Sequence, residues 1–181
     1  MVYSTKELLA SGETQRSIKR KVESGELFLL GRGIYSTNRR QPIDEAYLSV
    51  KYPHAVLTGY SAFSHYDLTD GVPEFYYLAT PRNSPPIKNK EVHQSYQESE
   101  TIYIGAITCA YKGNEVRIYG FERTLIELFR LQAKWPSDLY FEVLGSFRKK
   151  KGEIDFAKVN MYLRHFKNGV KLLQWIKEAF A

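Results

Sequence analysis

The sequence contains a single cysteine and no long apolar run. Because one cysteine cannot form a disulfide within the chain, we interpret Cys109 as a small buried side chain in a reducing compartment, with a catalytic thiol as the less favoured alternative. No apolar stretch approaches the roughly 18 residues of a membrane-spanning helix, and the first residues lack the form of a signal peptide. We therefore expect a cytoplasmic protein with no membrane partner.

Motifs that mark an enzyme are also scarce. No glycine-rich loop for a phosphate is present, and Glu115 and Arg117 follow a turn without the lysine and upstream aspartate of a restriction-type nuclease. The histidines do not have metal-ligand spacing with one another or with the cysteine: His54, His65, His93 and His165. We expect no enzymatic activity, no metal and no cofactor, and keep a metal-dependent nuclease with a helical DNA-targeting head as an alternative.

The composition is that of a folded protein whose positive charge is unevenly distributed. Of the 181 residues, 43% are hydrophobic and 25% charged, and the net charge is +6. Residues 1–40 hold eight Lys and Arg against four Asp and Glu, whereas residues 41–181 hold eighteen against sixteen. The excess therefore favours an anionic partner near the N-terminus.

Two short helices are predicted in this basic segment. Ser4 and Glu7 have the spacing of a capping box, and the helix that follows ends at Ser11-Gly12. Thr14 is expected to cap a second helix that ends at Ser24-Gly25. On this second helix Ile18 and Val22 lie four residues apart and are expected to face inward.

The outward side of the second helix carries the candidate DNA contacts. A helix in the major groove needs polar residues near its N-terminus that reach base edges, with cations that hold phosphates. Gln15 and Arg16 are placed for bases. The whole predicted set on this helix is Thr14, Gln15, Arg16, Lys19, Arg20 and Lys21. A solvated basic surface, or one that binds an acidic protein, remains the alternative.

A hairpin is predicted directly after this helix, with strands at residues 26–30 and 34–37. Gly31 and Gly33 are both expected to adopt the positive φ of a tight turn, with Arg32 at the tip to contact phosphate or the minor groove. Residues 27–30 are all apolar, so we expect both sides of the first strand to be covered. Arg39 and Arg40 in the following linker are further candidate phosphate contacts.

The remaining residues predict a mixed domain over 43–181. Strands are expected at 74–80, 91–96, 101–111 and 115–119, and helices at 43–51, 60–66 and 121–134. Apolar residues at helical spacing predict three more helices. The first is capped by Ser137 and carries Tyr140, Val143, Leu144 and Phe147. The second carries Phe156, Val159, Leu163 and Phe166, and the third carries Val170, Leu173, Ile176 and Phe180. The fold class is therefore α+β. Residues 148–151 are a basic run that either neutralises a helix end or provides a second contact to DNA or an acidic partner.

Four motifs, in this order, resemble the AbiEi family of bacterial antitoxins and transcriptional regulators. They are the pattern Gly12-x-Thr14-x3-Ile18-x3-Val22-x2-Gly25-Glu26-Leu27-x4-Arg32-Gly33-Ile34-Tyr35, the segment 55–68, the strand at 76–81, and Glu122-Arg123-Thr124-Leu125. Members of that family usually have another helix before Ser4. The resemblance therefore implies a reduced winged helix-turn-helix over 1–38, followed by an antitoxin-like α+β domain.

The resemblance also implies a function. It predicts a repressor that binds double-stranded DNA at inverted repeats in its own promoter, as the antitoxin of a type IV toxin–antitoxin system in phage defence by abortive infection. The functional partner would be a nucleotidyltransferase-like toxin. The resemblance assigns a structural role to Glu122-Arg123-Thr124 and implies no cofactor.

Overall fold

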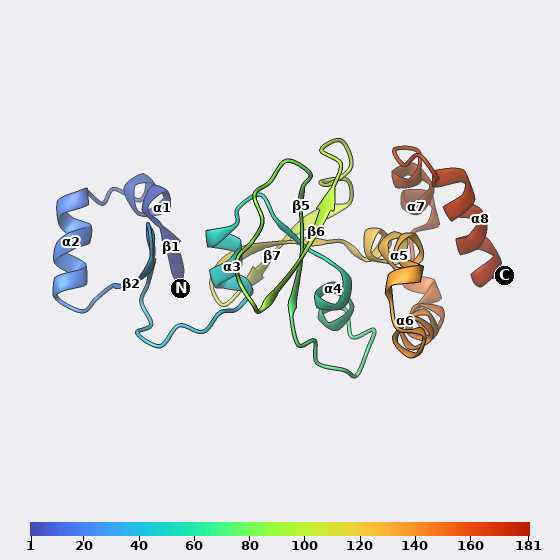
Figure 1. The fold of residues 1–181 in the computed structure, drawn as a ribbon, viewed down its shortest axis with the longest axis horizontal. Helices are drawn as coiled ribbons and strands as arrows, with labels where there is room; N and C mark the ends of the chain where they lie inside the picture. The colour runs from blue at the N-terminus through green and yellow to red at the C-terminus, as the bar shows by residue number, and fades with distance from the viewer. The chain divides into compact units, whose positions relative to one another are not determined.

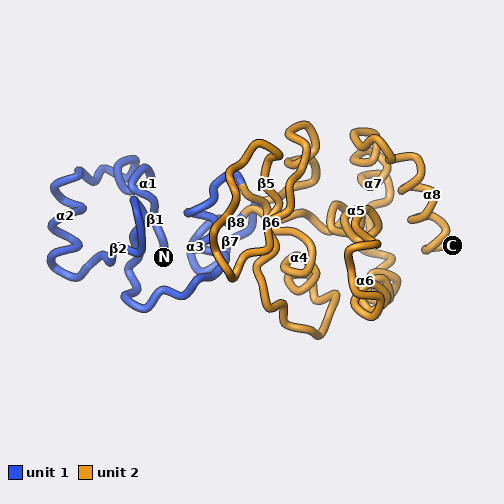
Figure 2. Tube along the Cα trace, viewed as in Figure 1, with its two compact units in different colours: residues 1–54, 108–116 blue, residues 55–107, 117–181 orange.

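The computed structural model describes all 181 residues and has a mixed α+β architecture, as expected (Figure 1). The chain divides into two compact units (Figure 2). Unit 1 comprises residues 1–54 and 108–116, and unit 2 comprises residues 55–107 and 117–181. None of the helices combines the length and the apolar character needed to cross a membrane.

The two predicted helices of unit 1 are present with the expected boundaries. Helix α1 spans Thr5–Ala10, and Ser4 and Glu7 form its capping box. Helix α2 spans Gln15–Glu23; the Thr14 hydroxyl accepts a hydrogen bond from the Ser17 amide at 3.1 Å. Both helices are followed by a glycine with positive φ, Gly12 at 95° and Gly25 at 77°. The predicted starts and stops are confirmed.

Unit 1 also contains a three-stranded antiparallel sheet in the order β1-β3-β2. Its strands are β1 (Val2–Ser4), β2 (Phe28–Gly31) and β3 (Ile34–Ser36). The sequence did not predict β1, because three residues are too few to establish an alternating pattern. The hairpin turn is Arg32-Gly33, and only Gly33 has a positive φ, 71°. The expectation for Gly31 is wrong, because this residue pairs with Ile34 as part of β2.

The apolar residues 27–30, most of which form strand β2, are covered at the two ends of the run but not in the middle. Leu27 packs with Leu8 and Ile18 beneath α1 and α2. Leu30 packs on the other cluster of the unit, which contains Val2, Ile34 and Ala46. Leu29 is 59% exposed, so the expectation that both sides of this strand are covered is wrong. Leu27 precedes the strand, and a bulge between Leu29 and Gly31 breaks the regular alternation.

Unit 1 extends beyond the expected boundary at residue 38. The predicted helix at 43–51 is present as α3 (Glu45–Lys51), which Asp44 caps through the Tyr47 amide at 3.0 Å. Ala46 on α3 belongs to the same apolar cluster as Ile34 on β3. This shared burial explains why the α3 segment joins the N-terminal helices in one compact unit.

Residues 108–116 are held to the first strand of unit 1, β1, by hydrogen bonds. Asn114 bridges the backbone of Val2, accepting from its amide at 3.0 Å and donating to its carbonyl. Lys112 lies 3.1 Å from the carboxylate of Asp44. The predicted turn at 112–114 is therefore present, and Lys112 and Gly113 both have a positive φ.

A five-stranded mixed sheet has the order β6-β5-β4-β8-β7. Its strands are β4 (Val56–Leu57), β5 (Tyr76–Pro81), β6 (Val92–Gln97), β7 (Ala106–Tyr111) and β8 (Asn114–Tyr119). Strands β5 and β6 run parallel and stay in register to their last residues, Pro81 opposite Gln97. The expected strand at 101–111 starts only at residue 106, because residues 101–105 form turns.

Helices of unit 2 enclose its largest apolar core. They are α4 (Gly59–His65), α5 (Phe121–Arg130), α6 (Ser137–Lys149), α7 (Phe156–Leu163) and α8 (Gly169–Ala179), with short 3-10 turns at Gln132–Lys134 and Lys151–Glu153. Ser137 does not cap α6, since it is the first helical residue after Pro136 and makes no cap bond. Val170 is 89% exposed and Leu172 is buried in its place, which corrects the predicted inner face of α8.

Candidate nucleic-acid interface

The outward side of α2 carries a row of exposed, largely unpaired polar and cationic side chains. Ile18 on the inner side is 2% exposed, whereas Gln15, Arg16 and Arg20 are exposed and make no hydrogen bond or ion pair within the chain. Lys19 has only a distant contact, 3.9 Å to Glu23 on the next turn. Such a weak surface pair leaves the Lys19 ammonium available to another anion.

Three of these side chains, Arg16, Lys19 and Arg20, border a shallow groove along α2. It is lined by Thr14, Arg16, Ser17, Lys19, Arg20 and Glu23. Thr14 is exposed, but its hydroxyl oxygen accepts the cap bond from the Ser17 amide. Any contact of Thr14 with a ligand therefore has to coexist with its capping role.

Lys21 differs from the other cations of α2 because its ammonium is paired within the chain. It is half-buried and bonds to the carboxylate of Glu13, which also accepts a hydrogen bond from the Ser17 hydroxyl at 2.5 Å. The hydrogen bond from Lys21 lowers the pKa of Glu13, and the same bond raises the pKa of Lys21. The pair holds the turn between α1 and α2, which contains Glu13, against helix α2, which contains Lys21. Sequence reasoning missed this role, although the spacing Glu13, Ser17, Lys21 places three polar residues on one side of a helix.

The hairpin tip presents Arg32 from a fixed position. Arg32 is exposed and makes no hydrogen bond or ion pair within the chain. The next residue, Gly33, accepts hydrogen bonds from the Thr5 amide at 2.9 Å and the Thr5 hydroxyl at 3.3 Å. The tip is therefore anchored to the start of α1. Arg39 and Arg40 follow β3 and are also exposed.

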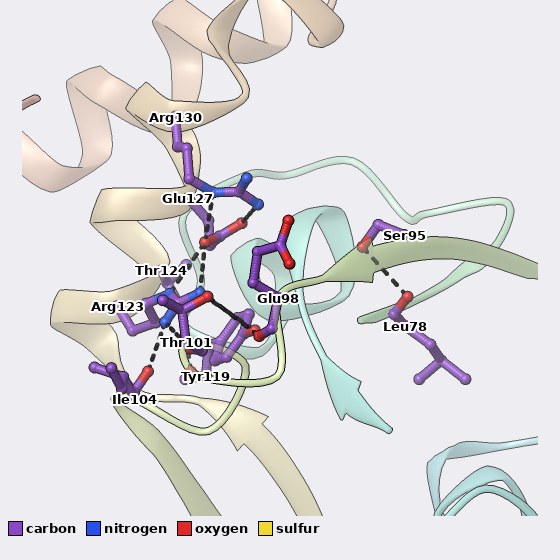
Figure 3. A network of polar contacts seen from close by, with 10 residues as sticks. All are labelled: Leu78, Ser95, Glu98, Thr101, Ile104, Tyr119, Arg123, Thr124, Glu127 and Arg130. Atoms are coloured by element: carbon purple, nitrogen blue, oxygen red, sulfur yellow. Dashed lines mark hydrogen bonds and ion pairs between the residues drawn. The ribbon is translucent and has the colours of Figure 1, made fainter. Parts of the chain in front are cut away.

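Two residues of the Glu122-Arg123-Thr124 motif, Arg123 and Thr124, lie in the interior of unit 2. Arg123 is fully buried, and its guanidinium donates to the carbonyls of Thr101 and Ile104, both at 2.8 Å (Figure 3). The Thr124 hydroxyl donates to the Tyr119 carbonyl at 3.1 Å. These contacts join the start of α5 to the loop after β6 and to the end of β8. Arg123 and Thr124 thus make structural contacts, and the partly exposed Glu122 accepts a hydrogen bond from the Asp155 amide at 3.3 Å.

The basic run at 148–151 mostly contacts the chain itself. The Arg148 guanidinium donates to the Ala179 carbonyl at 2.8 Å, and the Lys151 ammonium donates to the Phe180 carbonyl. Lys150 donates to the Tyr66 carbonyl at 2.7 Å, at the end of α4. Three of the four cations therefore satisfy carbonyls at helix ends, and Lys149 is the exposed one without a partner.

The residues considered for catalysis do not form a cluster. No three His, Cys, Asp or Glu side chains lie close enough together to hold a metal ion. Glu115 is exposed, and the Arg117 guanidinium lies 5.2 Å from the centre of the Tyr103 ring. Burial raises the pKa of Cys109, which is half-buried, and this disfavours its thiolate form.

Comparisons with protein-family models and with curated proteins give no match to the chain.

Proposed function

We propose that the chain is a sequence-specific DNA-binding transcriptional repressor that reads the major groove with α2. The main support for this proposal is the set of exposed side chains on α2. Gln15, Arg16 and Arg20 are exposed without a partner in the chain, and Arg16 and Arg20 lie on the side of α2 opposite the buried Ile18. Cations on one side of a short helix, next to a polar residue in its first turn, are what docking in the major groove requires, because the cations neutralise phosphates.

The order of elements in unit 1 supports a winged helix-turn-helix. Helices α1 and α2 are joined by a tight turn at Gly12, and the β2–β3 hairpin follows directly, with β1 pairing to β3. In this arrangement α2 is the recognition helix and the hairpin is the wing. The Glu13–Lys21 pair joins α2 to the turn that follows α1.

The chemistry of the exposed groups assigns them distinct roles. Gln15 and Arg16 lie in the first turn of α2, where an amide pairs best with adenine and a guanidinium with guanine. Lys19 and Arg20 lie further along the helix, and with Arg32, Arg39 and Arg40 they are suited to phosphates. Residues of the first kind would set sequence preference, and those of the second kind would set overall affinity.

The resemblance of the motifs to AbiEi proteins extends the proposal to a biological role. We infer that the chain represses its own operon from inverted repeats and acts as the cytoplasmic antitoxin of a nucleotidyltransferase-like toxin. Induction of a neighbouring nucleotidyltransferase gene should arrest growth, and co-expression of this chain should restore it. Continued arrest despite abundant chain would contradict the antitoxin role and leave DNA binding as a separate question.

Salt dependence tests the DNA-binding proposal. Binding of the full chain to a labelled duplex from its own upstream region should weaken steeply with salt. Contacts to about four to six phosphates give a slope of log K against log salt near −4 to −5. A flat response would contradict the proposed interface. Lys177→Ala, a single-charge change on α8, serves as the matched control and should leave the slope unchanged.

A further inference from the structure

Unit 2 contains a cleft of about 750 Å³ that the proposed function does not use. It lies between the loop after β6 and the start of α8. Its lining residues include Gln97, Arg130, Lys167, Asn168, Lys171 and Trp175. All of them belong to unit 2.

Gln97 is the first sign that this cleft takes a ligand. Gln97 as a whole residue is 4% exposed, and its buried side-chain amide nitrogen has no acceptor in the chain. An unsatisfied buried donor costs about 1–3 kcal/mol, so an uncompensated one needs an explanation. Gln97 is also the last residue of β6, which runs parallel to β5. The carboxyl ends of parallel strands are a common place for ligands in α/β sheets.

Positive charge is in excess around the cleft. Arg123 and Arg130 share the single carboxylate of Glu127, so this buried group keeps a net positive charge, and Arg130 extends it to the cleft wall (Figure 3). Lys167 and Lys171 add two cations. The lining contains two acidic residues, Glu98 and Glu100. Glu98 is already paired with Arg82, so Glu100 is the remaining negative charge to set against these cations.

The start of α8 supplies further donors. Asn168 occupies the N-cap position but makes no cap bond, and the amides of Val170 and Lys171 have no acceptor in the chain. The free amides and the dipole of an 11-residue helix favour an anion at this end. One turn later, the Lys171 ammonium lies 4.7 Å from the centre of the partly exposed Trp175 ring.

We propose that this cleft binds a small organic phosphate that carries a planar ring, of the nucleotide class. The phosphate lies at the start of α8 between Lys167 and Lys171, and the ring stacks against Trp175. An oxygen acceptor of the ligand accepts the unused hydrogen bond of the Gln97 amide. The site is independent of the DNA-binding surface, because none of its residues lies in unit 1.

Calorimetric titration of the full chain tests the proposal. The probes are AMP and GMP, the corresponding nucleosides and inorganic phosphate, at constant ionic strength. A nucleotide should bind at least about tenfold more tightly than its nucleoside, because the nucleoside lacks the charge-assisted contacts. Inorganic phosphate should bind more weakly than the nucleotide, because it lacks the ring. Absence of binding by both nucleotides at about 10 mM would overturn the proposal.

Three variants locate the site. Lys171→Ala should weaken nucleotide binding about tenfold, whereas Lys177→Ala on the same helix should leave it unchanged. Gln97→Leu should weaken binding several-fold without lowering the melting temperature, because it removes an unsatisfied donor as well as a ligand contact. Equal affinities for the Lys171 and Lys177 variants would place the ligand elsewhere and contradict the proposal.

Discussion

Arg123 and Glu127 form a fully buried ion pair one turn apart on α5, with 2.9 Å between the Arg123 Nη2 and the Glu127 Oε1. The Arg130 guanidinium reaches the other oxygen of the same carboxylate at 2.6 Å. The Arg123 guanidinium also lies 4.3 Å from the centre of the Tyr119 ring. One carboxylate thus holds two guanidiniums at the centre of unit 2, and its removal would leave both without their counter-charge.

Glu127→Gln should therefore destabilise the protein by about 3–5 kcal/mol, the range for breaking one side of a buried ion pair. Urea unfolding followed by circular dichroism measures the change. The control is Glu23→Gln, which alters the exposed Lys19–Glu23 contact and should cost less than about 1 kcal/mol. Equal losses for the two variants would contradict the structural role given to the buried group.

The same carboxylate makes stability depend on acid pH. Burial by itself raises the pKa of Glu127, but the charges of Arg123 and Arg130 outweigh it, so the pKa lies below the ordinary value of 4.5. A lowered pKa contributes stability that is present above the unfolded pKa and is lost as pH falls through the folded pKa. The free energy of unfolding should thus fall below about pH 4.5 more steeply in the wild type than in Glu127→Gln, as parallel urea series would show.

The hairpin offers a matched pair of glycine substitutions. Gly33 has a φ of +71°, and an added Cβ would lie 3.1 Å from the Thr5 hydroxyl, so Gly33→Ala should cost about 1 kcal/mol or more. An added Cβ at Gly31 meets no atom within 4 Å, and Gly31 does not have a positive φ. Gly31→Ala should therefore change the melting temperature little. The reverse order would show that the tip does not have this turn.

The basic run allows a comparison between neighbouring cations. Arg148→Ala removes the hydrogen bond to the Ala179 carbonyl and should cost about 0.5–1.5 kcal/mol. Lys149→Ala removes a cation without a partner and should stay within about 0.5 kcal/mol. Thermal unfolding measures both. A measurable loss of DNA affinity in Lys149→Ala with unchanged stability would instead assign this run to a DNA contact.

The parts of the fold that the sequence predicted are those set by local chemistry. Ser4 and Thr14 cap their helices because hydroxyl acceptors satisfy free amides, and this signal is readable from a few residues. Strand β4 was not predicted, because its two residues are too few to show the alternation of apolar and polar residues that marks a strand. The inner face of α8 was misassigned because Val170 and Leu172 are equally apolar, and only packing decides which one is buried.

The two candidate sites also differ in how far they could be predicted from the sequence. The side chains on α2 are close in sequence, so their common exposed face was predictable from helical spacing. The cleft of unit 2 joins Gln97, Arg130 and the start of α8, which are far apart in the chain. No local motif marks such a set, and the unsatisfied amide of Gln97 is visible only once the chain is folded.

The most direct test of the account is the sequence discrimination of Arg16→Ala. Equilibrium binding is measured on a duplex from the chain's own upstream region and on a scrambled duplex of equal length and composition, with Lys177→Ala as control. We predict that Arg16→Ala loses about 1–3 kcal/mol on the upstream duplex and little on the scrambled one, while Arg32→Ala weakens both alike. Wild-type discrimination in Arg16→Ala together with wild-type affinity in Arg32→Ala would contradict the claim that α2 and the hairpin read DNA.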